Sequence, residues 1–372
     1  MKISIIVPVY NLGDYIIDTL NSIDQQTYTD YECIIVNDGS TDKSKVIIEK
    51  YIAQKNKFKL ITTENKGVSA ARNKGLTHIT GGYIYFIDGD DLIPVNALEL
   101  LSVAALKHEA DVVIGKMMHQ RGGQLQEIST YKKYGVNTEG VKTLENNPEI
   151  LHSIGPTAKL FSRKVIGNYQ FPEGRKFAEE HAFIVNAYLK SDKIYGISQL
   201  VYNYVVRDKG NASATQTFDA NVEEYLANLM DTHQEVYELM KNRVSLKVMQ
   251  YYYFRITEFI MWPLLMTALK NPLKLPKVNS ILVDYFKTDA HEEMQKNDVF
   301  INVYVRNYIM HTDSDTFYKQ VEYLDYMKNL REELPLHERW LLKRKSKVKF
   351  EMYKLYFKIR MILLRVYRRL LK

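Results

Sequence analysis

The sequence is poor in the features that mark secreted and membrane-spanning proteins. It has 372 residues but a single cysteine, Cys33, so no disulfide can form within the chain. No uninterrupted apolar run reaches the ~18 residues that indicate a transmembrane helix. The first residues, Met1 to Pro8, predict a β-strand and lack the apolar stretch and cleavage site of a signal peptide. These absences predict a cytoplasmic protein.

The composition is that of a folded chain with a sizeable core. Hydrophobic residues make up 46% of the sequence, which excludes a largely disordered protein. Internal repeats and low-complexity segments are absent as well. Cys33 lies in an apolar run that extends to Val36, so we expect a small core residue there rather than a nucleophile or a metal ligand.

Positive charge is concentrated at the C-terminus. Residues 343–372 carry twelve Lys and Arg against one acid, a net charge of +11; since the whole chain carries +7, residues 1–342 carry −4. The basic balance therefore indicates no nucleic-acid surface on the body of the protein, and we expect no nucleic-acid partner. On a helical projection the tail has an apolar side flanked by basic residues, which is typical of a helix lying at an anionic membrane surface. Packing against the protein itself or a second subunit is the alternative.

Strands and helices alternate along the first 115 residues. This order favours a mostly parallel sheet with right-handed crossovers, so we predict an α/β, Rossmann-like nucleotide-binding domain. The predicted strands are Ile3–Val9, Tyr31–Asn37, Phe58–Thr63, Tyr83–Ile87 and Asp111–Gly115, and the predicted helices are Asp14–Gln26, Asp42–Gln54, Gly67–Thr80 and Val95–His108.

The rest of the chain predicts a change to helical structure. The periodicity fades between Met117 and Asn147, which indicates a loop or irregular hairpin at one edge of the site. From about Asp219 onward the pattern is helical, and a packing domain is favoured there over a ligand groove. Between these parts we predict a segment Thr157–Val165, a helix Ala178–Lys190 and a strand pair at Lys193–Ser198 and Val201–Val206. The predicted domains are 1–215 for the α/β part, 216–342 for the helical region and 343–372 for the tail.

Three carboxylates follow the fourth predicted strand within four residues. The apolar run Tyr83–Ile87 is followed at once by Asp88, Asp90 and Asp91. Open α/β sheets place their ligands at the carboxyl ends of strands, and closely spaced carboxylates repel one another unless a hard cation or basic groups neutralise them. The pattern predicts a site for Mn²⁺ or Mg²⁺. A helix cap at Asp91, for a helix that begins near Val95, is the alternative, but it explains one carboxylate of the three.

Polar residues also follow the first two strands, at the same predicted edge of the sheet. The ring of Tyr10 can cover a planar base, and Asp38 can accept the ring N–H of uracil. An Asx turn is the alternative for Asp38, whereas we interpret Asp42 as a helix cap. Further on, Arg72 follows a glycine, Gly67, and several small residues that permit close approach. Three roles are open for Arg72: it holds Asp38, faces a nucleotide or is solvated.

Together these blocks resemble the family 2 glycosyltransferases of the GT-A fold. The resemblance covers roughly residues 1–215, and the motifs occur in the family's order and spacing. They are Ile6-Val7-Pro8-Val9-Tyr10-Asn11, Gln26-Thr27-Tyr28, Val36-Asn37-Asp38-Gly39-Ser40-Thr41-Asp42, Gly67-Val68-Ser69-Ala70-Ala71-Arg72-Asn73 and Asp88-Gly89-Asp90-Asp91. The resemblance implies transfer of a sugar, with inversion, from a nucleotide diphosphate donor that is usually a UDP-sugar, with Mn²⁺ or Mg²⁺ on the diphosphate.

The same resemblance implies roles for individual residues. Asp90 would be the metal ligand, and Asp88 would face both the ribose and the metal. The nucleoside pocket would be lined by Pro8, Val9, Tyr10, Asp38 and Arg72. Asn65 and Asp91 are secondary candidates for the site, with no role assigned.

The family's catalytic base lies in a later acidic pair at the start of a helix. Glu179 and Glu180 match that pair, and Glu180 stands where the family commonly has Asp, so Glu180 is the expected base and Glu179 the secondary candidate. Without the resemblance, these two acids would be interpreted as favourable partners of the helix dipole. The segment from Tyr204 to Ser213 resembles the family's arginine-to-serine segment, which implies that Arg207 and Ser213 bind the diphosphate. A plain surface loop is the alternative.

The sequence therefore predicts an inverting, metal-dependent glycosyltransferase. We expect it to move a hexosyl or N-acetylhexosaminyl group from a UDP-sugar to a hydroxyl of a cell-surface glycopolymer (teichoic acid, capsule or exopolysaccharide) or of its lipid-linked precursor. The tail would hold the enzyme peripherally at the inner face of the cell membrane, or join two subunits in a homo-oligomer. The alternative is a non-catalytic protein that keeps the sugar-nucleotide fold and binds a membrane or partner through its tail. The presence of both Asp90 and Glu180 favours the enzyme.

Overall fold

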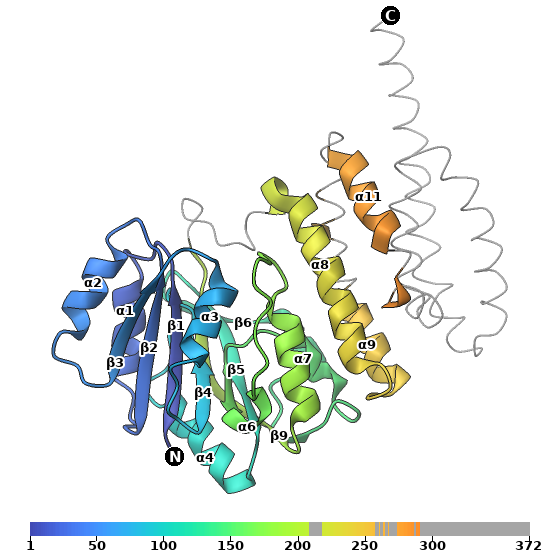
Figure 1. Cartoon of the computed structure of the whole chain (residues 1–372). Helices are drawn as coiled ribbons and strands as arrows, with labels where there is room; N and C mark the ends of the chain where they lie inside the picture. The colour runs from blue at the N-terminus through green and yellow to red at the C-terminus, as the bar shows by residue number, and fades with distance from the viewer. Residues whose placement is uncertain are drawn as a thin grey trace, which may run out of the picture. The chain divides into compact units, whose positions relative to one another are not determined.

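The computed structural model describes residues 1–207, 218–256, 274–285 and 288–290, together with the single residues 260, 263, 264 and 267. All of them belong to the unit Met1–Tyr304 (Figure 1). The predicted boundary at residues 215 and 216 and the basic tail at 343–372 lie outside the described residues. No helix within the described ranges is long and apolar enough to cross a membrane.

Apolar, β-branched runs form parallel strands in the N-terminal half, as the sequence predicts. β1 (Ile3–Val9), buried along its whole length, pairs in parallel with β2 (Tyr31–Asp38) on one side and β4 (Tyr83–Phe86) on the other. β3 (Phe58–Thr63) pairs in parallel with β2. The intervening helices begin one or two residues later than predicted: α1 (Ile16–Asp24), α2 (Ser44–Ile52), α3 (Val68–Leu76) and α4 (Ala97–His108).

The second half of the sheet is mixed. β8 (Lys159–Ser162) runs antiparallel between β4 and β5 (Val112–Arg121), and β9 (Ile194–Val205) runs parallel to β5. β7 (Gly140–Lys142) pairs with β9, and β6 (Gln124–Glu127) pairs with β5 off the main path. The strand order is β3-β2-β1-β4-β8-β5-β9-β7. The predicted α/β fold is confirmed, with an antiparallel insertion in its second half.

Two predicted segments differ in detail from the structure. The expected strand pair at 193–198 and 201–206 is wrong, because β9 is one continuous strand. Its register against β5 shifts between Ile114 and Met117, so an irregular ladder takes the place of the expected turn. The predicted loop at 117–147 instead contains the end of β5, then β6, α5 (Ser129–Tyr134) and β7. All four residues of β6 are exposed, which explains why no alternation of apolar residues marks that strand.

Different helices cover the two faces of the sheet. Cys33 and Ile35 of β2 point into a large cluster that includes residues of α1 and α4, whereas Ile34 and Val36 pack with Ala71 of α3. Cys33 is free and fully buried, as the sequence predicts. A strand with both faces covered has a continuous apolar run, which is why β2 was recognisable from its sequence.

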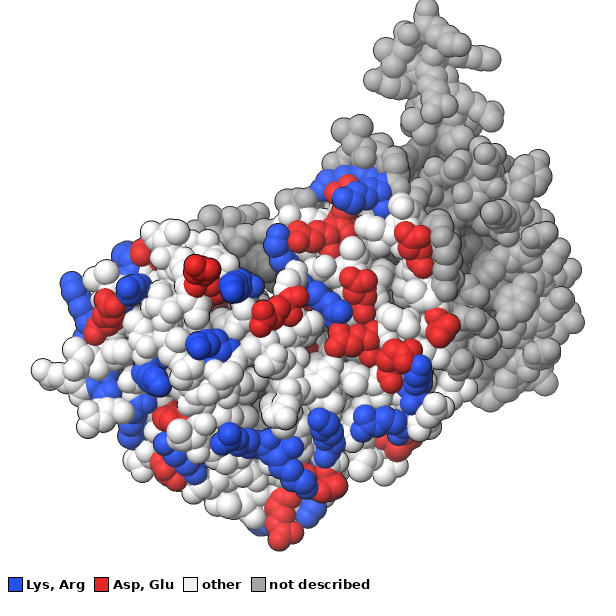
Figure 2. Space-filling model, viewed as in Figure 1, with Lys and Arg blue, Asp and Glu red and all other residues white. Residues whose placement is uncertain are grey.

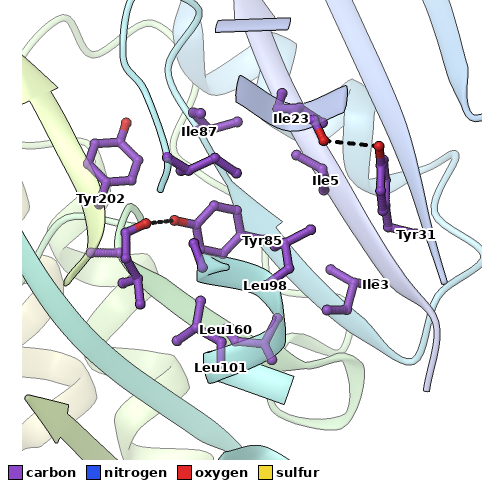
Figure 3. Close-up of a cluster of buried hydrophobic side chains, with 14 of the residues drawn as sticks. Ile3, Ile5, Ile23, Tyr31, Tyr85, Ile87, Leu98, Leu101, Leu160 and Tyr202 are labelled. Atoms are coloured by element: carbon purple, nitrogen blue, oxygen red, sulfur yellow. Dashed lines mark hydrogen bonds between the residues drawn. The ribbon is translucent and has the colours of Figure 1, made fainter. Parts of the chain in front are cut away.

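Two tyrosine hydroxyls tie elements of the larger cluster together. Figure 3 shows the hydroxyl of Tyr85 on β4 donating to the Val201 carbonyl of β9 at 3.0 Å. It also shows the hydroxyl of Tyr31 on β2 donating to the Ile23 carbonyl of α1, again at 3.0 Å. Each hydroxyl is therefore satisfied within the core.

The helices after β9 pack on the segment that follows β8. α6 (Arg163–Ile166) and α7 (Glu180–Lys190) follow β8, and α8 (Phe218–Met240) packs on α7. α8 in turn contacts α11 (Leu275–Tyr285), while α9 (Leu246–Ile256) packs on a short 3₁₀ helix, η1 (Pro148–His152).

Ion pairs join the residues just before α7 to α8. Arg175 lies 2.5 Å from Glu235, and Lys176 lies 3.1 Å from Glu224. Figure 2 shows acidic side chains gathered over α8 on this face, whereas basic side chains gather over α6. The residues just before α7 are therefore tied to α8 by ion pairs.

The packing of α3 on β1 yields a first prediction. A Cβ atom on Gly75 of α3 would lie 2.5 Å from Cγ2 of the buried Ile6. Gly75→Ala should therefore lower the free energy of unfolding by about 1–3 kcal/mol through overpacking. Helix propensity alone would favour alanine by about 1 kcal/mol, so the sign of the change separates the two effects.

Urea denaturation followed by circular dichroism measures this difference. Gly82→Ala is the matched control, because a Cβ there meets nothing within 4 Å, and its free energy of unfolding should change by less than about 0.5 kcal/mol. A more stable Gly75→Ala protein would contradict the close packing.

Candidate active site

The carboxyl ends of β1, β2 and β4 meet at one edge of the sheet, because these strands are parallel neighbours. Pro8 and Val9 are buried in β1, whereas Tyr10, the next residue, is 46% exposed. Asn11 has a left-handed backbone (φ 52°), and its side-chain oxygen accepts from the Thr41 N–H at 2.8 Å, which joins the loops after β1 and β2. Pro8, Val9 and Tyr10 were predicted to bind the nucleotide of the sugar donor, and Tyr10 is the exposed residue of the three.

Two aspartates near the end of β2 bind backbone N–H groups. The buried Asp38 accepts from the Gly67 N–H at 2.8 Å and from the Lys66 N–H at 3.0 Å, so it ties the end of β2 to the start of α3. Oδ1 of Asp38 also lies 3.4 Å from the Thr63 hydroxyl, whereas Oδ2 keeps a second lone pair beside its bond from Gly67. The expected contact with a uracil ring stays a prediction. Asp42 lies one residue before Lys43, the N-cap of α2, and its carboxylate accepts from the Ser44 N–H at 2.9 Å, so it binds the first turn of the helix without being the N-cap residue itself.

Asn65 lies where the loops after β2 and β3 meet. A Cβ atom on Gly39, which has a φ of 67°, would lie 2.7 Å from the Asn65 backbone nitrogen. The Asn65 side chain is exposed. The structure therefore places this secondary candidate beside the loop that follows Asp38.

Arg72 joins the acidic residues after β4 to those before α7. Its side chain is 6% exposed, and its guanidinium lies 2.9 Å from Oδ1 of Asp88 and 3.2 Å from Oε1 of Glu179. Burial opposes the charged form, but the carboxylates of Asp88, Glu179 and Glu180 raise the pKa of Arg72. The sequence indicated a residue that holds Asp38, faces the nucleotide or is solvated. Its burial excludes the solvated alternative, and its described ion pairs are with Asp88 and Glu179. The expected place of Arg72 in the nucleoside pocket stays a prediction.

Asp88 and Asp90 are each paired with an arginine. The Asp88 side chain, 34% exposed, binds Arg72, and Oδ2 of Asp90 accepts from Nε of Arg207 at 2.6 Å. Burial and the charge of Asp88 raise the pKa of Asp90, whereas Arg207 opposes this increase. Because each carboxylate is paired with an arginine, Asp88 and Asp90 can lie close together at the end of β4.

Asp91 has a different environment. Its buried carboxylate accepts from the Tyr202 hydroxyl at 2.6 Å and from the Val205 N–H at 2.7 Å, both on β9. Burial and the charges of Asp90 and Asp88 raise its pKa well above the ordinary value. The helix cap that was the alternative for Asp91 is therefore wrong, because the side chain binds β9 and not the start of α4.

The acidic pair stands at the start of α7. Ala178 has a left-handed backbone (φ 58°), and the helix begins at Glu180. Such a conformation costs a non-glycine residue of order 1–3 kcal/mol and is often found at functional sites. Burial and the charge of Glu179 raise the pKa of Glu180 to about 8, with Arg72 opposing the increase. A carboxyl group with a pKa near neutrality is suited to proton transfer.

Arg207 follows the end of β9, and Ser213 lies outside the described residues. The guanidinium carbon of Arg207 lies 5.0 Å from the centre of the Tyr15 ring. Sequence reasoning missed both Tyr15 and Tyr202. Asp91 and Tyr202 are 111 residues apart, so no local pattern connects them, although Tyr202 lies within a predicted strand.

The carboxylates of Asp88 and Asp90 are of the type and number that a protein usually supplies to a divalent cation bound with a phosphate substrate. Within the ranges that the structure describes, no group of three or more His, Cys, Asp or Glu side chains forms a metal cage. Mg²⁺ is usually held by one or two carboxylates together with phosphate oxygens of the substrate. Asp88 and Asp90, which follow β4, supply carboxylate oxygens that suit such a cation. Oδ2 of Asp90 also accepts from Arg207.

The chain is similar to several bacterial glycosyltransferases. Residues 4–169 match the model of glycosyl transferase family 2. The chain is 33% identical over 211 residues to glycosyltransferase GlyG of Streptococcus pneumoniae, covering 54% of this chain and 70% of GlyG. It is 30% identical over 246 residues to the poly(ribitol-phosphate) beta-N-acetylglucosaminyltransferase TarS of Staphylococcus aureus, covering 65% of this chain but 39% of TarS.

Solved structures show the same fold. The crystal structure of S. aureus TarS 1-349 in complex with UDP-GlcNAc has a TM-score of 0.65 at 24% identity, over 84% of this chain and 86% of that one. The mannosyltransferase PcManGT from Pyrobaculum calidifontis, in complex with GDP-Man and Mn²⁺, has a TM-score of 0.51 at 16% identity, over 83% of this chain and 82% of that one. The family match, the identity to GlyG and the shared fold lead to one conclusion: this chain belongs to glycosyltransferase family 2 and has the GT-A fold.

Proposed function

We propose that the enzyme transfers a sugar, with inversion and dependence on a divalent cation, from a UDP-sugar to a hydroxyl group of a cell-surface glycopolymer or its lipid-linked precursor. A polyol-phosphate polymer of the teichoic acid type is the acceptor that the relatives favour. TarS is named for transfer to poly(ribitol phosphate), and so is a beta-glucosyltransferase of Bacillus spizizenii that is 34% identical over 216 residues. The structure of TarS with UDP-GlcNAc supports a UDP-sugar donor.

The buried bridge through Arg72 is the observation that carries this proposal. One guanidinium contacts Asp88, at the end of β4, and Glu179, next to the proposed base Glu180. The donor and the acceptor hydroxyl have to meet where a base can reach the hydroxyl proton. Because Arg72 contacts both groups, the carboxylates of Asp88 and Glu179 lie on either side of one guanidinium.

The proposed reaction is a single displacement. Glu180 takes the proton of the acceptor hydroxyl while that oxygen forms a bond to the anomeric carbon of the donor sugar. The bond between the anomeric carbon and the diphosphate oxygen breaks on the opposite face, so the configuration inverts and UDP leaves. Arg207 stabilises the negative charge that develops on the diphosphate.

The remaining residues would bind the donor. Asp90 and Asp88 would hold a Mn²⁺ or Mg²⁺ ion, which when bound neutralises charge on the diphosphate. Tyr10 would cover the uracil ring and Asp38 would accept its ring N–H, with Pro8 and Val9 forming the floor of the pocket. Ser213 would join Arg207 at the diphosphate.

The location of the enzyme is part of the proposal. The basic tail at residues 343–372 would hold it at the inner face of the membrane, where a lipid-linked or membrane-associated acceptor is accessible. Assembly into a homo-oligomer through the tail is the other outcome that the sequence predicts. Liposome sedimentation of the chain with and without residues 343–372 separates these outcomes.

The metal assignment yields a second prediction. Asp90→Asn should weaken the Mn²⁺-dependent binding of UDP by at least ~10-fold, equivalent to ~1.4 kcal/mol, because an amide cannot replace the charge of a carboxylate at a hard cation. Isothermal titration calorimetry with UDP and Mn²⁺ measures the effect. Asp91→Asn is the matched control: Asp91 binds β9, so its replacement should change unfolding and leave the metal-dependent part of UDP binding largely intact. Undiminished binding by Asp90→Asn would remove Asp90 from the metal site.

The base assignment yields a third prediction. Glu180→Gln should bind UDP and Mn²⁺ as the wild type does, yet lose ~10²–10⁴-fold in kcat, the usual contribution of general-base catalysis. Transfer of radiolabelled sugar to the acceptor measures kcat, and calorimetry measures binding. Glu179→Gln is the comparison, because it removes the negative charge that pairs with Arg72. A larger loss of kcat in Glu179→Gln, with UDP binding unchanged, would transfer the base role to Glu179.

The raised pKa of Glu180 yields a fourth prediction. The base acts when deprotonated, and its pKa is raised to about 8 in the free protein. The deprotonated fraction therefore rises with pH up to about 8, and kcat/KM should rise by up to ~10-fold per pH unit below that value and level off above it, since kcat/KM reports the free enzyme. Initial rates between pH 5.5 and 9.5 give the profile. An ordinary carboxyl pKa in this profile would indicate that the acidic pair is not the base.

A further inference from the structure

Arg207 makes its closest described contacts with Asp90, the proposed metal ligand. Nε of Arg207 lies 2.6 Å from Oδ2 of Asp90, and a terminal nitrogen of the same guanidinium contacts the same oxygen. Both side chains are 16% exposed. A charge-assisted pair that is largely shielded from water is strong, and either partner is costly to leave alone.

The position of Arg207 is fixed by neighbouring residues. The Val205 N–H donates to Asp91 at 2.7 Å and the Val206 N–H donates to the Gln120 carbonyl at 2.9 Å, so the backbone before Arg207 is bound on both sides. The Tyr15 ring lies 5.0 Å from the guanidinium carbon, within the range of a cation–π contact. The strand that anchors Asp91 thus also delivers the arginine to Asp90.

A divalent cation bound at Asp90 would compete with this guanidinium for the same carboxylate. Both are positive and both bind carboxylate oxygens, so they repel each other when they share Asp90. Asp88 does not face this competition in the same way, because its partner, Arg72, is also held by Glu179. The exchange of one cation for another is therefore centred on Asp90.

We propose that Arg207 is the counterion that occupies Asp90 until a divalent cation displaces it, so that Arg207 sets the affinity of the free enzyme for metal. This inference rests on the proposed function, in which the diphosphate gives the displaced guanidinium a new partner. Metal and UDP then bind cooperatively, since each assists the exchange that the other needs, and this coupling is reciprocal. The wild-type protein without nucleotide binds metal weakly as a consequence.

The experiment is a titration of the full chain with Mn²⁺, in which electron paramagnetic resonance measures the free ion, without and with UDP. Without UDP, Arg207→Gln should bind Mn²⁺ roughly tenfold or more tightly than the wild type, because Asp90 loses its competing partner. Tyr15→Leu, which loosens the guanidinium but keeps its charge, should shift the affinity in the same direction by a smaller factor. With UDP, the wild type should gain more Mn²⁺ affinity from the nucleotide than Arg207→Gln does.

Lys43→Gln controls for the loss of a positive charge near the same edge of the sheet. Lys43 pairs with Asp14 on the surface, so its removal should leave Mn²⁺ binding as in the wild type. Circular dichroism establishes that each variant is folded, and Tyr15→Leu serves alone if Arg207→Gln is not.

The two possible failures are distinguishable. Mn²⁺ affinity without UDP that is unchanged or weaker in Arg207→Gln and Tyr15→Leu would overturn the competition and leave the proposed function intact, provided that Asp90→Asn loses Mn²⁺ binding. If neither the wild type nor Arg207→Gln binds Mn²⁺ even with UDP, the metal dependence in the proposed function fails, and the competition fails with it.

Discussion

The positive charge of the buried Arg72 guanidinium holds carboxylates from two distant segments close together. Carboxylates removed from water are destabilised unless they are paired, and Arg72 pairs two of them that belong to segments 107 and 16 residues away from it. Features of the fold serve to place this side chain. Asp38 holds the backbone where α3 begins, and Gly75 lets α3 lie against β1. A substitution of Arg72, Asp38 or Gly75 should therefore move the carboxylates of Asp88 and Glu179 together.

Three neighbouring aspartates differ in role because they differ in surroundings. Asp91 is enclosed by β9 and hydrogen-bonded to it, so it stabilises the structure. Asp90 is paired with Arg207, and Asp88, which is paired with Arg72, is the most exposed of the three aspartates. Environments that push the pKa values of nearby carboxyl groups apart are a common basis for dividing structural, binding and acid–base roles. The sequence alone gives these residues the same chemistry.

Much of the N-terminal half was predictable because its signals are local. β1 was predicted with its observed bounds, since a continuous apolar run marks a strand with both faces covered. β3, a partly exposed edge strand, was also predicted with its observed bounds from its β-branched and aromatic residues. Tyr10, Asp38, Asp88 and Asp90 lie at or just after strand ends that the topology brings together, whereas Arg72 lies on α3 and Glu180 at the start of α7. What could not be predicted are the partners: that Arg72 binds Glu179, that Asp91 binds Tyr202, and that β9 continues through its irregular ladder. These depend on tertiary pairing between distant segments, which no local spacing encodes.

The sheet order also has a consequence for how the chain folds as it is synthesised. β3, β2, β1 and β4 pair only with one another until β8 is made, so this half of the sheet can assemble once the first 86 residues are available. β5 can pair at first only with the short strand β6 that follows it, because its other partners, β8 and β9, are made later. The edge that would bind the nucleotide thus forms early, whereas the acidic pair of α7 is placed late. Until β8 arrives, the open edge of β4 is exposed, and such unpaired edges are sites of aggregation in slowly folding chains.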